Sequence, residues 1–403
     1  MTATEPPAVR PMASGDAIPA PRRDSPIGVF LQCTNLGGME RVAYSLFDRL
    51  AARGFDLRIA TPRPWGLGEP LVKRVDAGAE AFDYRGKFGW RSFRHFHQRT
   101  KVVGENCDCL WVIGTCASCL AAARMTGRPA LLSHHYAHFE NRASWLRWMG
   151  FYLAFGAGLD GITYPTEFTR NEAIKIAPWL EPKTHVVRNG FDVHYFGEEQ
   201  RLAARRAARA ELQIPPDAFL VGNGGWLIRS KRFDVFLKTA RHVLNQIPNA
   251  LFHICGGGPE ETHLRELARQ SGIASQVHFA GWVKNMTPYY QAWDVQLFNT
   301  DFDALGCTPL EAASHGCLCV ASCTYGGLWE FIKDGRTGFI IEQHDEFRLA
   351  DAIARLARNP GLALQIRQRA ARLLQRKFNH ESALKFYENY FQAHTADRRQ
   401  TAS

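Results

Sequence analysis

Two series of short apolar runs alternate along this chain with longer segments whose apolar residues recur at helical spacing. The first series has such runs at 27–31, 55–61, 110–113, 130–133, 161–164 and 184–187. The second has them at 219–222, 250–255, 276–280, 295–299 and 319–321. This alternation predicts parallel sheets with helices on both faces. The predicted fold class is therefore α/β, with two Rossmann-like, doubly wound domains that face each other across a cleft.

The length of the chain also favours two domains, since 403 residues exceed the roughly 250–300 that a single core usually reaches. An Arg- and Ala-rich stretch without a strand pattern, 197–209, marks the boundary. We expect a disordered tail at 1–25, an N-terminal domain at 26–196 and a C-terminal domain at 197–378. A final amphipathic segment, 379–395, is expected to form a helix that returns to the first domain.

No secretory signal or membrane span is visible in the sequence. The Pro-rich tail holds no apolar run of signal-peptide length, and no stretch of about 18 apolar residues occurs. We therefore expect a cytoplasmic protein, in which the ten cysteines are reduced and buried. A zinc site is the alternative for the cysteines between 107 and 119. The LWVIGT sequence among them argues against it, because it has the pattern of a buried strand.

The formal charge of +10 at pH 7 points to an anionic partner, such as nucleotide phosphates, anionic lipid headgroups or nucleic acid. Nucleic-acid recognition usually interleaves aromatic and basic residues, and no such motif is visible, so we expect no nucleic acid partner. An apolar stretch at 145–155 carries Trp145 and Trp148 near Arg142 and Arg147. It is interpreted either as core packing or as a peripheral contact with an anionic membrane surface on its inner, cytoplasmic face.

The stretch 298–331 concentrates the polar chemistry of the chain. Asp303 and Glu311 flank a loop and the start of a helix, with Pro309 in a first-turn position. The residues between the two carboxylates include Ala304, Leu305, Gly306, Cys307 and Thr308. A helix N-terminus presents free N–H donors and a partial positive charge, and carboxylates accept hydrogen bonds from hydroxyl pairs. This combination predicts a ligand that carries both hydroxyls and phosphates.

Several separated motifs occur in an order that is typical of one enzyme family. They are Gly37-Gly38-Met39-Glu40, Asn189-Gly190-Phe191-Asp192, the stretch 223–234, Gly256-Gly257-Gly258-Pro259-Glu260, Asp303-x7-Glu311 and Gly326-Gly327-Leu328-Trp329-Glu330. Over roughly 27–391 the chain resembles the retaining nucleotide-sugar glycosyltransferases of family 4, which have the GT-B fold. The resemblance implies a nucleotide-sugar donor on the C-terminal domain, a glycan or lipid-linked acceptor on the N-terminal domain, and a role in bacterial-type polysaccharide or glycolipid synthesis. It implies no cofactor, because the nucleotide sugar is a substrate and metal is not required.

The resemblance also implies roles for individual residues. Glu311 is expected to hold the ribose hydroxyls, while Asp303, shortened from the family's usual Glu, meets the donor sugar together with the N–H groups of 304–307; Thr308 belongs to the same site. Lys231 falls on the lysine that binds the diphosphate. The glycines expected to let the backbone approach the donor are Gly37, Gly38 and Gly257. A solvated loop charge and simple tight turns are the structural alternatives, and the Gly-Gly segment at 326–330 is interpreted as scaffold.

One departure from the family pattern concerns the diphosphate. Trp226 occupies the position of the family's usual arginine. Either Arg229 or Arg232 reaches the phosphates instead, or donor affinity is weaker. We also regard Asp303 as the residue that sets donor choice, because it differs from the family's Glu.

A cluster of histidines follows the strand predicted at 130–133. The family often places a histidine at this strand end that contacts the donor sugar near the reacting carbon, and His135 aligns with it. His134 and His138 are further candidates, with a purely structural role as the alternative. Asn189, in the N-G-x-D motif, is interpreted as part of the hinge and as another candidate for the site.

The predicted catalytic set is His135, Lys231 and Asp303, and it includes no carboxylate assigned as a nucleophile. A front-face mechanism is therefore expected, in which the leaving diphosphate, neutralised by Lys231 and a helix N-terminus, helps to deprotonate the acceptor. Asp301-Phe302-Asp303 spells a DxD, which in another glycosyltransferase class holds a metal ion, but we expect no metal here. Trp226 and the shortened Asp303 motivate an alternative function, a non-catalytic nucleotide-sugar or glycan-binding protein on the same fold.

Overall fold

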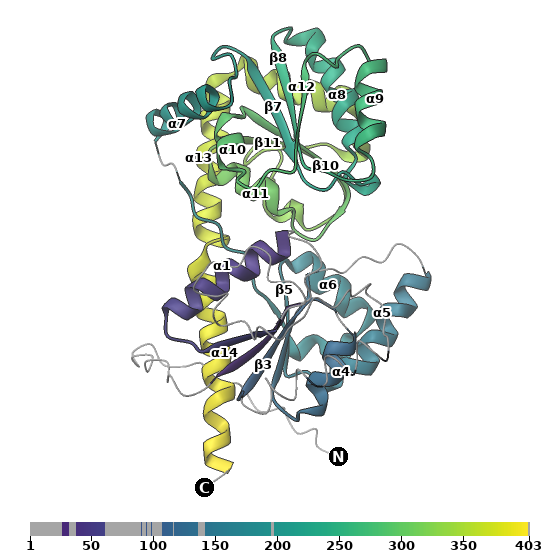
Figure 1. Cartoon of the computed structure of the whole chain (residues 1–403), viewed down its shortest axis with the longest axis vertical. Helices are drawn as coiled ribbons and strands as arrows, with labels where there is room; N and C mark the ends of the chain where they lie inside the picture. The colour runs from purple at the N-terminus through teal and green to yellow at the C-terminus, as the bar shows by residue number, and fades with distance from the viewer. Residues whose placement is uncertain are drawn as a thin grey trace, which may run out of the picture.

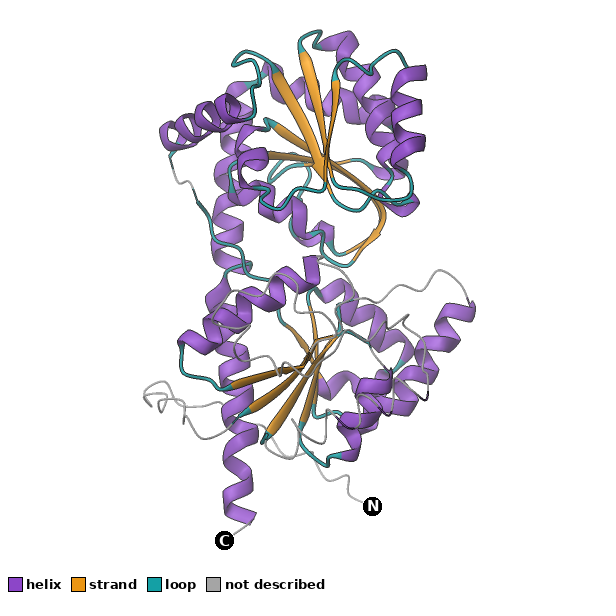
Figure 2. Cartoon of the chain, in the orientation of Figure 1, coloured by secondary structure: helices purple, strands orange, loops and turns teal. Residues whose placement is uncertain are grey.

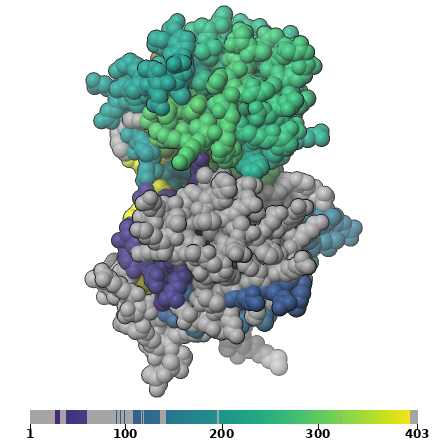
Figure 3. Space-filling view, viewed as in Figure 1, coloured from purple at the N-terminus to yellow at the C-terminus, as the bar shows by residue number. Residues whose placement is uncertain are grey.

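The computed structural model describes residues 26–31, 38–60, 90, 94, 98, 107–115, 117–135, 142–194 and 197–401. The expected tail at 1–25, Gly37 and His138 lie outside the described residues. Two lobes, each built on one six-stranded sheet, are stacked along the long axis of the molecule (Figures 1 and 3). The predicted α/β class with two parallel sheets is confirmed.

The N-terminal lobe holds a parallel sheet in the strand order β2-β1-β3-β4-β5-β6. Its strands are β1 (Ile27–Leu31), β2 (Leu57–Ala60), β3 (Cys109–Ile113), β4 (Ala130–Ser133), β5 (Gly161–Tyr164) and β6 (Thr184–Val186). Its helices are α1 (Gly38–Ala52), α4 (Ala117–Met125), α5 (Arg142–Phe155) and α6 (Glu167–Ile176). The 3-10 segment η1 (Gly156–Gly158) follows α5, and η2 (Pro178–Lys183) follows α6. Because successive strand residues point to opposite faces, Val29 packs on the α1 side and Phe30 on the α4 and α5 side.

The C-terminal lobe repeats this architecture in the strand order β12-β11-β10-β7-β8-β9, again with parallel pairing throughout the described strands (Figure 2). Its strands are β7 (Phe219–Gly224), β8 (Ala250–Cys255), β9 (Val277–Gly281), β10 (Val295–Asp303), β11 (Leu318–Gly326) and β12 (Phe339–Ile340). Its helices are α7 (Glu198–Glu211), α8 (Phe233–Gln246), α9 (Glu261–Gln270), α10 (Thr287–Ala292), α11 (Cys307–Ser314), α12 (Glu346–Arg358) and α13 (Pro360–Lys377). The 3-10 segments are η3 (Arg229–Lys231), η4 (Leu328–Glu330) and η5 (Glu342–His344).

The strand order of each sheet reverses once. The chain moves outward from β1 to β2 and then returns to β3 on the other side of β1, and it moves from β7 through β9 before returning to β10 beside β7. In open parallel sheets the loops at the carboxyl ends of the strands that flank such a reversal form a crevice. The loop after β7 and the loop after β10 therefore lie together in the C-terminal lobe, and α1 begins near the matching point of the N-terminal lobe.

The last helix, α14 (His380–Thr401), packs on the N-terminal sheet although it follows the C-terminal lobe in sequence (Figure 1). Tyr387 lies against the ring of Trp111 at a centroid distance of 4.5 Å, and Phe391 is fully buried in the same core. Arg53 of the α1 end forms ion pairs with Glu381 and Glu388 at 2.5 and 2.6 Å. The two lobes are thus connected both by the chain after β6 and by α13 and α14.

Two further findings bear on the sequence predictions. The Arg- and Ala-rich stretch forms α7, whose Arg205 and Arg209 both pair with Asp294 of the C-terminal lobe at 2.9 and 2.7 Å. Among the helices that the structure describes, none combines the length and the apolar character needed to cross a bilayer.

Candidate functional site

A cavity of about 320 Å³, which we call the first cavity, lies between the two lobes at the carboxyl ends of the strands. The N-terminal lobe contributes Gly38, Met39, His135, Pro165 and Asn189 to its wall. The C-terminal lobe contributes Asn223, Gly224, Gly225, Trp226, Ile228, Lys231, Phe233, Phe298, Asn299, Asp303, Ala304, Leu305, Cys307 and Thr308. The structure therefore brings the whole predicted catalytic set into one space, although its members come from segments about 70 to 170 residues apart in the sequence.

Asp303, the last residue of β10, organises the turn that leads into α11. Its Oδ1 accepts hydrogen bonds from the N–H groups of Gly306 at 2.7 Å and Leu305 at 3.3 Å. Gly306 has a φ of 75°, a left-handed conformation that glycine adopts without steric cost. An aspartate that bonds the backbone two and three residues ahead forms a local turn of its own. The N–H groups of Leu305 and Gly306, which the resemblance directed at the sugar, are consequently engaged by Asp303 here.

The other carboxylate oxygen of Asp303 faces Lys231. The distance between Lys231 Nζ and Asp303 Oδ2 is 2.7 Å, and the ammonium also lies 5.8 Å from the ring centroid of Phe298. Lys231 ends η3, so the short helical turn directs its side chain toward the end of β10. Both side chains are about one quarter exposed, which leaves them accessible from the first cavity.

A second, smaller cavity of about 100 Å³ adjoins the first. The two share Gly38, Gly224, Gly225, Trp226 and Thr308 as wall residues. Glu311 lies in the second cavity, where its Oε2 accepts a hydrogen bond of 2.7 Å from the hydroxyl of Tyr290. Burial and the Glu311 carboxylate hold the pKa of Tyr290 well above its ordinary value, so the phenol stays a donor.

The wall of the second cavity is strongly aromatic. The rings of Trp226 and Trp282 meet nearly at right angles, with centroids 6.0 Å apart, and the two side chains are 37% and 52% exposed. Large exposed aromatic rings at a cavity mouth offer stacking surface to a planar ligand group. Arg41, on the first turn of α1, faces the same cavity from the other lobe.

Two helix N-termini from different lobes meet at the border between the cavities. Gly38 begins α1 and Cys307 begins α11. A Cβ atom placed on Gly38 would lie 3.4 Å from the Cβ of Cys307, so the two helix starts lie close together. Each N-terminus carries free N–H groups and a partial positive charge. Together with Lys231 they form a positive region suited to an anion.

The histidines separate into two environments. His135 lines the first cavity, and burial lowers its pKa to about 4, so the ring is neutral at pH 7. His134 instead lies in the core, where its Nδ1 is 3.2 Å from the hydroxyl of Tyr152 and its ring packs on Trp148. Of the two described candidates, only His135 therefore reaches the cavity, and His134 is structural.

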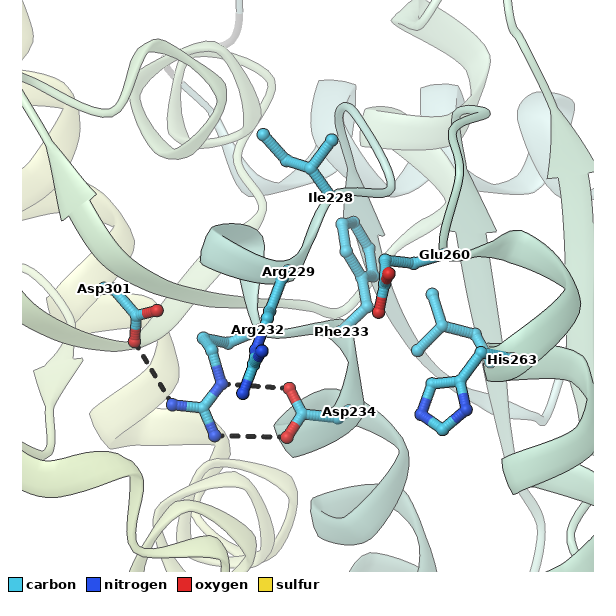
Figure 4. A pocket seen from close by; sticks show the side chains of 9 residues that line it. Ile228, Arg229, Arg232, Phe233, Asp234, Glu260, His263 and Asp301 are labelled. Atoms are coloured by element: carbon cyan, nitrogen blue, oxygen red, sulfur yellow. Dashed lines mark hydrogen bonds and ion pairs between the residues drawn. The ribbon is translucent and has the colours of Figure 1, made fainter.

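The two candidate arginines lie elsewhere. Arg229 and Arg232 line a third cavity of about 590 Å³, together with Asp234, Glu260 and Asp301 (Figure 4). Arg232 donates to both oxygens of Asp234 at 3.0 and 3.1 Å and to Asp301 at 3.2 Å. Both arginines thus lie outside the walls of the first two cavities, and the replacement of the family's arginine by one of them stays a prediction.

The remaining predicted residues have mixed outcomes. Gly257 lines neither of the first two cavities and accepts a backbone hydrogen bond from Leu227 at 3.0 Å, whereas its neighbour Gly256 does line the second. Asn189 lines the first cavity and donates from Nδ2 to Cys307 Sγ at 3.4 Å, which joins the two lobes. Burial raises the pKa of the Cys307 thiol far above its ordinary value.

The two carboxylates of the DxD sequence contact different cations. Asp301 points to Arg232 and lies 3.2 Å from His344, while Asp303 points to Lys231. The two carboxylates thus face different partners, although residues two apart on a regular strand lie on the same face. In the part of the chain that the structure describes, no group of three or more potential ligand side chains is arranged to hold a metal ion.

Sequence reasoning missed several residues of this site. Arg41, Tyr290 and Trp282 belong to segments that carry no motif, and their approach to Glu311 depends on how α1, α10 and the loop after β9 pack. The Gly-Gly segment was interpreted only as scaffold, although its Glu330 contacts the other lobe. Arg41 alone among these residues could have been found from the sequence, because it directly follows the Gly-rich loop at 37–40.

Comparisons with known proteins show which family this chain resembles. The model of Glycosyltransferase Family 4 matches residues 36–195, and the model of Glycosyl transferases group 1 matches residues 204–373. The chain is 27% identical over 179 residues to the lipopolysaccharide core biosynthesis glycosyltransferase LpsE of Rhizobium meliloti, covering 44% of this chain and 51% of that protein. It is 24% identical over 305 residues to the GDP-mannose-dependent alpha-(1-6)-phosphatidylinositol monomannoside mannosyltransferase of Mycobacterium tuberculosis, covering 69% and 77% of the two chains.

A solved structure of similar fold is Anabaena Alr3699/HepE in complex with UDP-glucose. It superposes with a TM-score of 0.69 at 16% identity, covering 91% of this chain and 99% of that one. The chain spans about half the length of the first curated relatives that it matches.

Proposed function

This chain belongs to glycosyltransferase family 4 and has the GT-B fold, and we propose on that premise that it is a retaining glycosyltransferase. It moves a sugar from a nucleotide-sugar donor to a glycan or lipid-linked acceptor, in bacterial-type polysaccharide or glycolipid synthesis. The observation that carries this proposal is the first cavity, where Lys231 and Asp303 of one lobe face His135 and Gly38 of the other. The names of the relatives, which include lipopolysaccharide and phosphatidylinositol mannoside enzymes, support the class of acceptor.

The two adjoining cavities suggest how the donor lies. Its sugar occupies the first cavity beside Asp303, and its nucleoside occupies the second, with the ribose hydroxyls on Glu311. The diphosphate then spans the border, next to Lys231 and the two helix N-termini. Trp226, at the position of the family's arginine, stacks on the base instead of holding a phosphate, and Trp282 meets its ring edge-on. Charge on the diphosphate is therefore neutralised by Lys231 and backbone N–H groups.

The chemical step follows from these positions. As the bond between the sugar and the diphosphate breaks, negative charge grows on the leaving phosphate, where Lys231 and the helix N-termini stabilise it. The leaving phosphate accepts the proton of the acceptor hydroxyl on the same face, so the anomeric configuration is retained. Neutral His135 contacts the sugar through hydrogen bonds and adds no charge of its own. Asp303 is held by Lys231 and two backbone N–H groups, an arrangement that orients its carboxylate and disfavours its use as a nucleophile.

Turnover of a defined donor tests the proposal. The protein is incubated with UDP-, GDP- and ADP-sugars, with and without a glycan or glycolipid extract, and both free nucleotide and transferred sugar are measured. We expect one donor to be consumed, also in the presence of EDTA, and the product to keep the donor's anomeric configuration by NMR. Binding of a donor without any consumption would instead support the non-catalytic nucleotide-sugar or glycan-binding protein, and an inverted product would contradict the front-face step.

A peripheral contact with an anionic membrane is part of this proposal, with the protein on the cytoplasmic side. The apolar stretch at 145–155 lies on α5. Its residues Trp148 and Tyr152 are buried, whereas Trp145, Leu146 and Leu153 are 36%, 55% and 60% exposed. Exposed aromatic and aliphatic groups beside arginines suit the interface of an anionic bilayer. Flotation with vesicles tests the contact: recovery with phosphatidylglycerol vesicles but not with phosphatidylcholine vesicles is expected, and Leu146→Ser with Leu153→Ser should reduce it.

A further inference from the structure

The side chain of Glu330 bridges the two lobes. Its Oε1 accepts a hydrogen bond from the backbone N–H of Phe168 at 3.1 Å, and its Oε2 accepts from Nε and Nη2 of Arg188 at 3.2 and 2.9 Å. Glu330 ends η4 of the C-terminal lobe, while Phe168 lies in the first turn of α6 and Arg188 follows β6. Within the described residues, these partners of the carboxylate all belong to the N-terminal lobe.

The chemistry of this bridge makes it stronger than an ordinary surface ion pair. The N–H of Phe168 is one of the free donors at the N-terminus of α6, where the partial positive charge of the helix attracts a carboxylate. The guanidinium of Arg188 adds a full charge and two donors that converge on one oxygen. The side chains of Glu330 and Arg188 are only 18% and 24% exposed, so water competes weakly for them.

The bridge is connected to the turn at the donor site through two glycines. The N–H of Gly327 donates to the carbonyl of Asp303 at 3.1 Å. A Cβ atom on Gly326 would lie 2.0 Å from the Asp303 carbonyl oxygen, and one on Gly327 would lie 2.2 Å from that of Ala304. The segment that carries Glu330 and the turn after β10 therefore pack backbone against backbone, and neither can shift without the other.

The same helix of the N-terminal lobe also contacts the turn directly. Thr166, the N-cap residue of α6, donates from Oγ1 to the carbonyl of Ala304 at 3.1 Å. Two turns along, Glu172 accepts a hydrogen bond from the hydroxyl of Tyr325 on β11, and Phe168 meets the Tyr325 ring edge-on at 4.8 Å. The N-terminus of α6 thus contacts the Asp303 turn on one side and the end of β11 on the other.

We propose that Arg188 and Glu330 are positioning residues of the transfer reaction, which hold the turn after Asp303 in its donor-binding shape only when the lobes are closed on each other. This inference rests on the proposed function. It predicts that the N-terminal lobe raises donor affinity through residues that do not touch the donor. Neither Arg188 nor Glu330 lines the first or the second cavity, so an effect of their substitution on the donor is indirect, and amide exchange in the turn shows whether it passes through that segment.

Two substitutions test the bridge with little change of shape. Glu330→Gln removes the charge, and Arg188→Lys keeps the charge but loses the paired donors. The matched control is Glu167→Gln, because Glu167 also lies near Arg188, at 3.5 Å, but belongs to α6 itself and is 52% exposed. Thermal unfolding is measured for each variant, and the two bridge variants serve as alternatives if one of them does not fold.

Titration calorimetry with UDP and with GDP, small-angle X-ray scattering, and amide hydrogen exchange of the 303–308 segment provide the measurements. Coupling between distant sites usually changes affinity about 5- to 150-fold. We expect Glu330→Gln and Arg188→Lys to weaken the tighter-binding nucleotide by roughly 5- to 50-fold, to raise the KM of the donor more than they lower kcat, and to speed exchange in this segment. Scattering should report a larger radius of gyration, while Glu167→Gln stays within about twofold of the wild type in affinity.

The outcomes separate this inference from the proposed function. If the wild-type protein binds nucleotide but both bridge variants keep its affinity and its exchange rates, the bridge is merely structural and the inference is wrong. If Glu167→Gln weakens the nucleotide as much as Glu330→Gln, the effect does not come from the contact between the lobes and the inference is also wrong. A wild-type protein that binds neither nucleotide and consumes no donor overturns the proposed function, and the donor role of the bridge with it.

Discussion

The ammonium of Lys231 lies 2.7 Å from Oδ2 of Asp303, so the cation assigned to the diphosphate is neutralised by the carboxylate assigned to the sugar. A donor whose phosphate reaches Lys231 must share or replace this contact. Asp303 is the more firmly held partner, because its other oxygen bonds Gly306 and Leu305. We therefore expect Lys231 to be the side chain that moves when a diphosphate binds at this position.

Asp303→Asn should separate the two roles of the pair. Without the carboxylate charge, Lys231 is free for phosphate, so affinity for UDP or GDP should rise about two- to fivefold, the value of one partly exposed ion pair. Transfer should fall by roughly 10- to 100-fold, since hydrogen bonds to charged groups contribute about 1.5–3 kcal/mol. Calorimetry gives the first quantity and donor turnover the second. A parallel loss of both would mean that Asp303 acts on the diphosphate site as well.

Lys231→Met should weaken nucleoside diphosphate binding by roughly 10- to 100-fold, because the charge-assisted contact to phosphate is lost. Arg229→Ala is the matched control: Arg229 lies two residues away but lines the third cavity, so its affinity should stay within about twofold of the wild type. The same titration decides between them. Strong weakening by Arg229→Ala would restore the idea that this arginine takes the place of the family's usual one.

Glu311→Gln should weaken donor binding by roughly 10- to 100-fold, because an amide accepts hydroxyl hydrogen bonds less strongly than a carboxylate. Tyr290→Phe should have a smaller effect, about two- to tenfold, since it removes only the hydrogen bond that orients Glu311. Tyr289→Phe serves as the control at the neighbouring position, and KM for the donor is the readout. Equal effects of Tyr289→Phe and Tyr290→Phe would count against the orienting role.

Trp226→Ala should lower affinity for the nucleotide by about 10-fold or more, since stacking of a base on an aromatic side chain contributes roughly 1–3 kcal/mol. Trp179→Ala is a control of similar exposure, because Trp179 is 48% exposed in the N-terminal lobe and lines neither donor cavity. Binding of the free nucleoside should weaken in parallel with the diphosphate. If only the diphosphate were affected, Trp226 would act on the phosphates and the stacking role would be wrong.

Stability should fall as the pH drops from about 6.5 toward 4, because several histidines are buried in neutral form. Burial lowers the pKa of His134 to about 3 and of His253 and His315 to about 4. Above the unfolded pKa of about 6.5 neither state binds these protons. Below it the unfolded chain binds them, so the free energy of unfolding falls by up to about 1.4 kcal/mol per pH unit for each residue.

Urea unfolding at several pH values between about 7.5 and 4.5 measures how the free energy of unfolding changes with pH. His253→Phe removes one titrating ring while keeping its shape in the contact with Tyr289, so the slope should become shallower by about one proton. An unchanged slope in this variant would show that His253 does not contribute.

The fold could be predicted from the sequence because its signals are local. Strand runs such as 27–31 and 250–255 recur in the structure with the same bounds, since apolar residues in a buried parallel strand are contiguous and the helices between them have their own period. Short motifs with glycine, lysine and carboxylate residues at set spacings likewise pointed to Lys231, Asp303 and Glu311. Within such a motif the short backbone limits where the side chains can lie.

Sequence by itself therefore determined the two parallel α/β sheets. It also determined that two segments carry charged residues suited to a ligand: 229–232, and 303–311 at the start of a helix. Only the tertiary structure decided which side chains share a cavity. It separated His135 from His134, directed Arg229 and Arg232 away from Lys231, brought Trp282 to Trp226, and joined Glu330 to Arg188 across the lobes. The reason is physical: side-chain direction in a short turn, and contacts between residues distant in the sequence, depend on how whole elements pack, and no local pattern records that packing.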